Sequence, residues 1–369
     1  MRCVSGLVVG LSLIGIAEGC GNTDPGADTD AGTDASTSES GTTTDAANTS
    51  TAPTAGSGTT TDPASSTAAA VTSDGSASSE DTTAGDSSST GDPAACPRTA
   101  VRPGEYVGLQ LEFDGRARNY NMFVPSGYDG SEATPLVFNF HGFGSNAAQQ
   151  TFFSDFNVDA EERGVITLYP NGVSNSWNAG ACCGVATGRD VDDVGFVRAL
   201  LDEVATTLCI DRSRVYATGM SNGGFMSHRL ACEAADIITA VGPVAGPLGL
   251  PEEDCQPARP MPVIHFHGTA DVVVPYPGNL TGFPPVEDSL QGWADRNGCD
   301  PESSVTLEMD DASCQTWDGC DGDATVTLCS LAGAGHCWPG QVFCPSGVSS
   351  LTLRANEMML DLFEQHTLP

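Results

Sequence analysis

Lysine is missing from this chain: all 14 of its basic residues are arginine, against 48 aspartate and glutamate residues. The absence of lysine excludes mechanisms that need a lysine Schiff base, a P-loop lysine or a Ser-Lys dyad. A formal net charge of −34 argues against nucleic-acid binding, because contacts to phosphates need a basic face. We attribute the acidity to solubility or salt tolerance and not to a specific site.

Large apolar residues are scarce between residues 21 and 95. Residues 21–95 are rich in Ser, Thr, Ala, Gly and Asp, with Val71 as their one large aliphatic residue and no aromatic residue. Such a segment cannot bury enough apolar surface to offset the entropy of ordering it. We therefore expect a disordered tether with a reach of roughly 45–50 Å. Two roles fit this segment: a stalk between the membrane and the catalytic domain, or low-complexity sequence that the protein can do without.

The N-terminal apolar run, from Val8 to Ile16, is too short to span a bilayer. With an arginine before it, the run is typical of an export signal over residues 1–20. The Gly-Cys junction at Cys20 resembles a bacterial lipoprotein signal, although Ala17 and Glu18 depart from that pattern. Cys20 is thus a candidate for lipidation, and ordinary signal cleavage is the alternative. We expect a secreted or cell-surface protein whose membrane contact is a lipid anchor on the bacterial outer envelope, if it has one.

Cysteine is abundant: apart from Cys3 and Cys20, twelve of the 14 cysteines lie in residues 96–369. An even number in an exported protein favours disulfides over metal ligation, and we interpret the adjacent pair Cys182-Cys183 in the same way. Asp321-Gly322 is a hairpin turn signal. With these two residues as the loop, opposed positions predict a first disulfide, and two further bridges are plausible. The three pairs are Cys314–Cys329, Cys299–Cys320 and Cys337–Cys344.

The most informative motif has a serine at its centre: Gly219-Met220-Ser221-Asn222-Gly223 matches G-x-S-x-G. A β-branched and aromatic run from Arg214 to Thr218 precedes it and reads as a buried strand. From Phe225 to Cys232, apolar residues at helical spacing predict a helix with one apolar stripe on the sheet. This order of strand, turn and helix predicts a nucleophile on a strained elbow. The alternative is a tight Gly-Ser turn without chemistry.

A serine hydroxyl needs a base, and in α/β-hydrolases the histidine follows the serine and the acid in the chain. His336 lies in a glycine-rich loop after a predicted strand, which makes it the candidate base. The other histidines after Ser221 are less suitable. His228 lies on the predicted elbow helix, two turns past Ser221, and cannot swing back to it. We expect His265 and His267 to be packed and His366 to be solvated.

The candidate acid is Asp271, which follows a predicted strand ending at His267. The carboxyl end of such a strand is where ligands bind in an α/β sheet. The alternative is that Asp271 only caps a turn. Asp254, Asp288 and Asp295 lie in less suitable places.

Two backbone N–H groups are the candidate oxyanion donors. Asn222 follows the serine at a helix N-terminus, where the helix dipole favours negative charge. The loop His141-Gly142-Phe143-Gly144 follows an early predicted strand, and Phe143 is the candidate for the second donor. Each donor is typically worth about 3–4 kcal/mol in the transition state.

Asp192 and Asp193 could be taken for paired acid/base carboxylates. We interpret them instead as residues that cap the following helix and favour it electrostatically.

Seven motifs in order resemble the polyhydroxybutyrate depolymerase and feruloyl esterase group of carbohydrate esterase family 1, over about residues 105–365. They are His141-Gly142, Trp177-Asn178, Cys182-Cys183, Asp192 to Phe196, Arg214 to Gly224, His267 to Asp271 and Gly335 to Gly340. The resemblance implies Ser221 as nucleophile, Asp271 as acid and His336 as base. It also implies that Trp177 and Trp338 line the substrate pocket and that His141 and Asn178 contact substrate.

The expected fold is an α/β-hydrolase over residues 96–369: mainly parallel sheet, helices on both faces, and several disulfides. The activity implied by the resemblance is that of an extracellular serine esterase, a monomer without metal or cofactor, acting on feruloyl or acetyl esters of xylan. Polyhydroxybutyrate or another polyester is the alternative substrate. The rival classes are a serine peptidase of related fold and a non-catalytic surface-anchored binding protein.

Overall fold

The computed structural model of the protein describes residues 96–97, 101–280 and 282–369. The expected export signal, the tether of residues 21–95 and Cys20 lie outside the described residues. Among the residues that are described, no helix has the length and apolar character needed to cross a bilayer.

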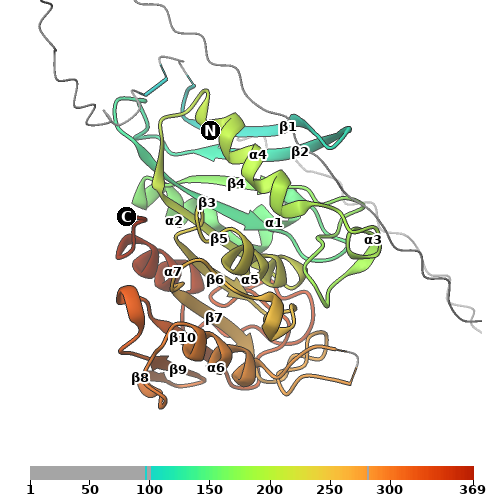
Figure 1. The fold of residues 1–369 in the computed structure, drawn as a ribbon, viewed down its shortest axis with the longest axis vertical. Coiled ribbons are helices and arrows are strands. Elements are labelled where there is room, and N and C mark those ends of the chain that lie inside the picture. Colours follow the sequence, from blue (N-terminus) through green and yellow to red (C-terminus); the bar gives the residue numbers. More distant parts are fainter. Residues whose placement is uncertain (1–95, 98–100, 281) are drawn as a thin grey trace, which may run out of the picture. The chain divides into compact units, whose positions relative to one another are not determined.

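One ten-stranded sheet organises the described chain, in the order β1-β2-β4-β3-β5-β6-β7-β10-β9-β8 (Figure 1). The six strands from β4 to β10 in this order are parallel, whereas β1, β2, β9 and β8 extend the two edges antiparallel. This is the α/β-hydrolase fold that the sequence predicts. The strands are β1 Gly104–Phe113, β2 Arg116–Val124, β3 Thr134–Phe140, β4 Ile166–Pro170, β5 Ile210–Met220, β6 Ala240–Val244, β7 Val263–Gly268, β8 Ser304–Met309, β9 Ala312–Trp317 and β10 Val326–Leu331.

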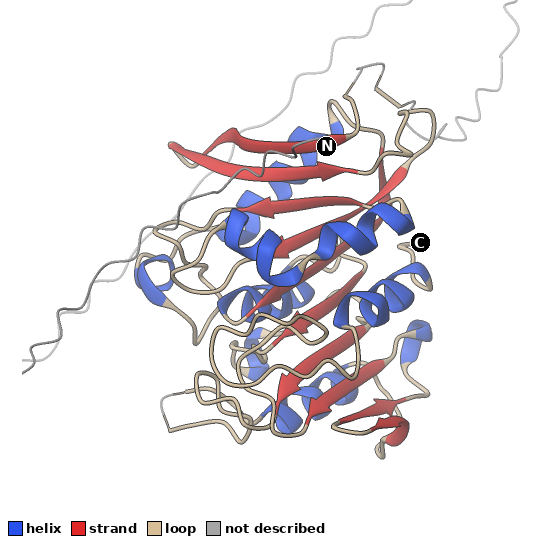
Figure 2. Ribbon diagram, turned by 180° about the vertical axis from the view of Figure 1, so that it is seen from behind, coloured by secondary structure: helices blue, strands red, loops and turns tan. Residues whose placement is uncertain are grey.

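Helices cover both faces of the sheet, as expected for parallel strands joined by crossovers. Residues of α4, α5 and α6 belong to one apolar core, and residues of α2 and α7 belong to the other. Figure 2 shows the sheet from behind, with helices crossing in front of its strands. The helices are α1 Ala147–Ser154, α2 Phe156–Arg163, α3 Gly184–Gly188, α4 Asp193–Ala205, α5 Asn222–Glu233, α6 Val286–Arg296 and α7 Ala355–Glu364, with 3₁₀ turns at η1 Glu252–Asp254 and η2 Asp321–Asp323.

The hairpin of β9 and β10 has the predicted register, with Cys314 opposite Cys329, but the predicted two-residue loop is wrong. The connection runs over residues 318–325, and the Asp321-Gly322 pair lies at its centre inside η2. A disulfide from Cys320 to Cys299 ties this longer loop to the segment before β8. Because the loop extends equally on both sides of its centre, the strands keep the same register.

Six disulfides join all twelve cysteines of the described residues. Such a number indicates an oxidising compartment outside the cytosol. The set contains the three pairs expected above, and it joins the adjacent cysteines to each other. The bonds are Cys96–Cys209, Cys182–Cys183, Cys232–Cys255, Cys299–Cys320, Cys314–Cys329 and Cys337–Cys344.

The prediction that α5 buries one apolar stripe is wrong in this detail: the helix is buried on nearly all sides. Ser227 and His228, which the stripe leaves on its polar side, have no exposed surface. The helix packs on the sheet with one side and on α4 and α6 with another, so its polar residues need partners inside the protein. His228 finds such partners, which are described below.

Candidate active site

The residue at the predicted elbow, Ser221, lies between the end of β5 and the start of α5. Its backbone has φ 58° and ψ −123°, a combination that costs a non-glycine residue on the order of 1–3 kcal/mol. Its neighbours must be small: a Cβ on Gly219 would lie 2.6 Å from the carbonyl oxygen of Phe140, and one on Gly223 only 2.1 Å from it. The two glycines are therefore needed for the elbow to sit against β3.

His336 and Asp271, from two separate loops, meet beside the elbow. The Nδ1–H of His336 donates to Oδ2 of Asp271 over 2.7 Å, and both residues are buried. With its proton on Nδ1, the ring keeps a lone pair on Nε2 that can accept a proton from a hydroxyl group. The loop after β10 holds His336 in place, since its N–H donates to the carbonyl of Ser346 over 2.7 Å.

The carboxylate of Asp271 is held from several directions. Its Oδ1 accepts the backbone N–H groups of Val273 and Val274, over 2.8 and 2.9 Å. Burial by itself raises the pKa of Asp271, but the N–H groups of His267, His336 and Val274 outweigh it and hold this pKa well below its usual range. Asp271 is therefore an anion wherever the protein is folded near neutral pH.

A cavity of about 280 Å³ opens over the elbow, and both Ser221 and His336 line it. The other walls are largely apolar. They are formed by Gly142, Phe143, Ser145, Gln150, Phe153, Met220, Val273, Pro345 and Ser346. The arrangement places a strained serine and a histidine with a free Nε2 around one apolar space.

Of the two candidate oxyanion donors, Phe143 lines this cavity, and Asn222 directly follows Ser221 in the chain. Asn222 is the first residue of α5, so its N–H has no partner inside the helix. The N–H of Phe143 makes no hydrogen bond within the described residues. The loop that carries it approaches closely, since a Cβ on Gly142 would lie 3.3 Å from Cβ of Ser221.

The expectation that Trp177 and Trp338 line the pocket is wrong. Both indoles are completely buried and belong to the two apolar cores. The Trp177 N–H donates to the carbonyl of His141 over 2.9 Å, and that of Trp338 donates to Oδ1 of Asn356 over 2.8 Å. These side chains support loops around the site and do not reach the cavity.

His141 and Asn178 are likewise buried and do not line this cavity. The ring of His141 bridges two backbone groups: Nδ1–H donates to the carbonyl of Gly142, and Nε2 accepts the N–H of Gly172. Burial lowers the pKa of His141 to about 4, so the ring is neutral. Asn178 donates through its side-chain amide to Asp190 and to the carbonyl of Val191.

Three further residues line the cavity that the sequence does not predict there. Phe153 comes from α1, Val273 from the turn after Asp271, and Pro345 from the loop after His336. The signal for Val273 and Pro345 is their closeness in sequence to the predicted acid and base. Phe153 has no comparable signal.

The aspartate pair before α4 splits into two roles. Asp192 caps the helix as predicted, accepting the N–H of Gly195 over 2.7 Å. Asp193 has no exposed surface and forms a buried ion pair with Arg118 at 2.8 Å.

The prediction that His366 is solvated is wrong, because its side chain is half-buried and burial lowers its pKa.

Comparison with known proteins gives one family model, described as "Esterase PHB depolymerase", that matches residues 118–274. Feruloyl esterase B of Piromyces equi is 35% identical over 227 residues, which are 58% of this chain and 41% of that protein. Feruloyl esterase C of Emericella nidulans is 30% identical over 190 residues, 50% of this chain and 63% of that protein. The chain thus spans less than two thirds of either relative. An acetyl xylan esterase from Aspergillus awamori superposes with a TM-score of 0.48 at 14% identity, over 67% of this chain and 94% of that chain.

Proposed function

We propose that this chain belongs to the feruloyl esterase and polyhydroxybutyrate depolymerase group of the α/β-hydrolase superfamily and is an exported serine carboxylic ester hydrolase. One observation carries the proposal: a serine in the strained elbow conformation shares a cavity with a histidine whose other nitrogen donates to a buried carboxylate. Nucleophile, base and orienting acid are the groups that acyl transfer to a serine requires.

In this mechanism Nε2 of His336 takes the proton of the Ser221 hydroxyl as Oγ attacks the ester carbonyl carbon. The negative charge that develops on the carbonyl oxygen is stabilised by the N–H groups of Asn222 and Phe143. His336 then gives the proton to the leaving alcohol, and the acyl group stays on Ser221. A water molecule then attacks the acyl carbon while it gives a proton to His336. The bond to Oγ breaks, the acid leaves, and His336 returns the proton to Oγ of Ser221.

Asp271 has two tasks in this cycle. Its hydrogen bond fixes the tautomer of His336 that leaves Nε2 free. Its charge stabilises the imidazolium that forms when His336 takes the serine proton. The low pKa of Asp271 supports this role, because an acid that stays ionised is needed throughout the cycle.

The substrates we propose are feruloyl or acetyl esters of plant polysaccharides. The names of the relatives support this class, and the apolar walls of the cavity, with Phe143 and Phe153, suit an aromatic or aliphatic acyl group. Polyhydroxybutyrate is the second candidate, because the matching family model is described by that activity.

A substrate panel tests the proposal: methyl ferulate, acetylated xylan, hydroxybutyrate oligomers and a peptide, each with the wild type and with Ser221→Ala. We expect release of ferulate or acetate by the wild type and none by the variant. Ser227→Ala is the matched control, because its hydroxyl is buried on the same helix, donates to the carbonyl of Gly223 and does not line the cavity. Peptide cleavage without ester cleavage, or ester cleavage by Ser221→Ala, would refute the assignment.

For the domain organisation we propose an export signal over residues 1–20, a tether over 21–95 and a catalytic domain over 96–369. The disulfides support export. Cys20 is the proposed lipid attachment site. A test is the fractionation of producing cells: Cys20→Ser should release the enzyme from the membrane fraction, and an unchanged distribution would refute the anchor.

A further inference from the structure

Three buried histidines form a chain that the proposed mechanism does not use. His228 on α5, His265 and His267 on β7 are at most 1% exposed. Nε2 of His228 lies 3.2 Å from Nδ1 of His265, and Nε2 of His265 lies 3.0 Å from Nδ1 of His267. Their rings stack with interplanar angles of 28° and 20°.

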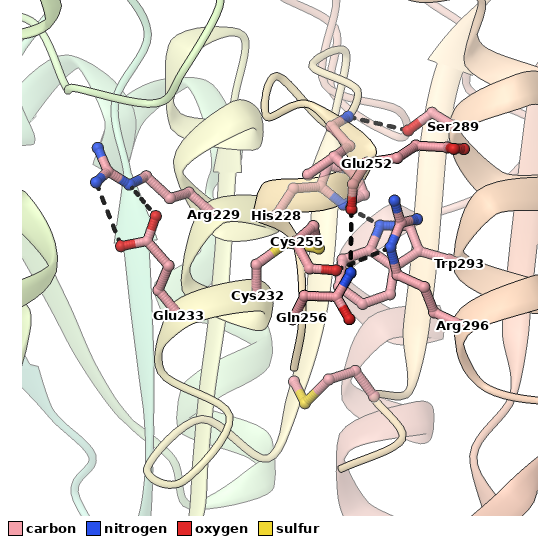
Figure 3. Close-up of a disulfide and its surroundings, with 12 residues drawn as sticks. His228, Arg229, Cys232, Glu233, Glu252, Cys255, Gln256, Ser289, Trp293 and Arg296 are labelled. Carbon is pink, nitrogen blue, oxygen red and sulfur yellow. Dashed lines mark hydrogen bonds and ion pairs between the residues drawn. A yellow bond between two sulfur atoms is a disulfide. The ribbon is translucent and has the colours of Figure 1, made fainter. Parts of the chain in front are cut away.

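The two ends of the chain fix the direction of every hydrogen bond in it. At one end the indole of Trp293, which can only donate, gives its N–H to Nδ1 of His228 over 2.9 Å. Figure 3 shows these two residues facing each other from α6 and α5, next to the Cys232–Cys255 disulfide. At the other end the carbonyl of Val274, which can only accept, receives the Nε2–H of His267 over 2.8 Å. Each ring therefore accepts at Nδ1 and donates from Nε2.

This pattern requires uncharged rings in the chain. A proton added to Nδ1 of His265 would point at the Nε2–H of His228. Burial also disfavours the charged ring that this proton would create. Burial lowers the pKa of His228 to about 3 and that of His265 well below its ordinary value. The titratable groups around the chain are Arg296 and Glu252 near its Trp293 end, and Tyr276, Glu287 and Asp271 near its His267 end.

The last ring of the chain faces the turn that carries the candidate acid. Besides its hydrogen bond to Val274, Nε2 of His267 lies 3.4 Å from Oδ2 of Asp271. That is the oxygen that accepts the N–H of His336. His267 thus holds the turn from Asp271 to Val274 on the inner side, and it brings the positive end of an N–H bond close to the carboxylate.

We propose that His267 is a positioning residue for Asp271, and that its contacts with His265 and with the carbonyl of Val274 fix the direction of the N–H that it presents to the carboxylate. This inference rests on the proposed function. The N–H of His267 aligns the carboxylate and competes with His336 for Oδ2. Without it, Oδ2 becomes a stronger acceptor for His336, and the turn is less well fixed.

The test compares three variants of the full chain by pH profiles of ester hydrolysis. For His267→Leu we expect kcat to fall by about 10–100-fold, the range typical of groups that orient a reacting residue from behind, with KM little changed. The acidic limb of kcat/KM should move to higher pH, because the imidazolium of His336 is held more tightly by Oδ2. His267→Gln keeps an amide N–H for the turn and should recover most of both effects.

Trp293→Phe is the matched control, because it removes one N–H from the same chain at the end remote from Asp271 and does not line the cavity. It should lower the melting temperature and leave the acidic limb where it is. Two results would overturn the proposal: a His267→Leu variant with the wild-type kcat and the wild-type acidic limb of kcat/KM, or a Trp293→Phe variant that moves this acidic limb as far as His267→Leu does.

A measurement on the wild type covers the case in which His267→Leu does not fold. The ¹⁵N shifts of the side chains should identify His228, His265 and His267 as Nε2–H tautomers at pH 7.5, and an Nδ1–H tautomer at any of them overturns the direction of the chain. A wild type that hydrolyses none of the panel esters refutes the proposed function and this inference with it. An active wild type with an unchanged His267→Leu refutes this inference alone.

Discussion

Replacing Gly223 by alanine tests how closely the elbow depends on the strand beside it. A Cβ at this position would lie 2.1 Å from the carbonyl oxygen of Phe140, 2.6 Å from its carbonyl carbon and 2.9 Å from the carbonyl oxygen of His141. All three atoms are backbone, so no side chain can turn away to make room. Either α5 or the end of β3 must shift.

The expected cost follows from that geometry. Overfilling a packed interior typically costs about 1–3 kcal/mol of unfolding free energy. The contact here is with backbone atoms, which cannot turn aside as a side chain can. We therefore expect a loss at or above the upper end of that range. The same shift moves Phe143 relative to Ser221, and loss of one oxyanion donor costs about 10²–10³ in kcat. Activity should fall by at least about tenfold even where the variant is folded.

The assay is urea unfolding together with hydrolysis of p-nitrophenyl acetate. Gly188→Ala is the matched control, because Gly188 is helical and nothing lies within 4 Å of its added Cβ. It should be neutral or slightly stabilising, by up to about 1 kcal/mol. Wild-type stability and activity in Gly223→Ala would show that the described approach of α5 to β3 is incorrect.

Two further predictions concern the acid and one disulfide. Asp271→Asn should lower kcat by about 10⁴, because an amide lets His336 take the wrong tautomer; steady-state kinetics with a circular dichroism control measures this, and an effect below tenfold would contradict it. Because the pKa of Asp271 is depressed on folding, its stabilising effect is full above the unfolded value of about 3.9 and is lost as pH falls through the folded value. The difference in unfolding free energy between wild type and Asp271→Asn should therefore shrink below about pH 4, as read from urea titrations at pH 7, 5, 4 and 3, and a difference that grows toward low pH would contradict the assignment. Replacing Cys314 and Cys329 together by alanine opens a link of sequence separation 15 and should cost about 3 kcal/mol of unfolding free energy, while unchanged stability would refute the bond.

The sequence predicts the elbow well because its determinants are local. Ser221 needs glycines on both sides, a strand before and a helix after, and all of these are visible within a few residues. The fold follows from the same alternation of strands and helices. The register of Cys314 and Cys329 was predictable since it depends on the centre of the loop and not on its length.

Features that depend on distant parts of the chain were not predictable. Trp177 and Trp338 stand in loops, where an indole can face either a cavity or the core, and only the position of Asn356 and of the His141 carbonyl decides. His228 and His265 are 37 positions apart, and nothing in either local pattern says that their rings meet. The long loop before β10 also depends on a remote partner, Cys299.

The mass spectrum of the protein after reaction with a fluorophosphonate, followed by peptide mapping, tests most directly whether Ser221 is the nucleophile. We expect one adduct, on Ser221, in the wild type and in Ser227→Ala, and no adduct in Ser221→Ala. An adduct on another residue, or a wild type that hydrolyses esters without any adduct, would refute the role of Ser221 as the nucleophile.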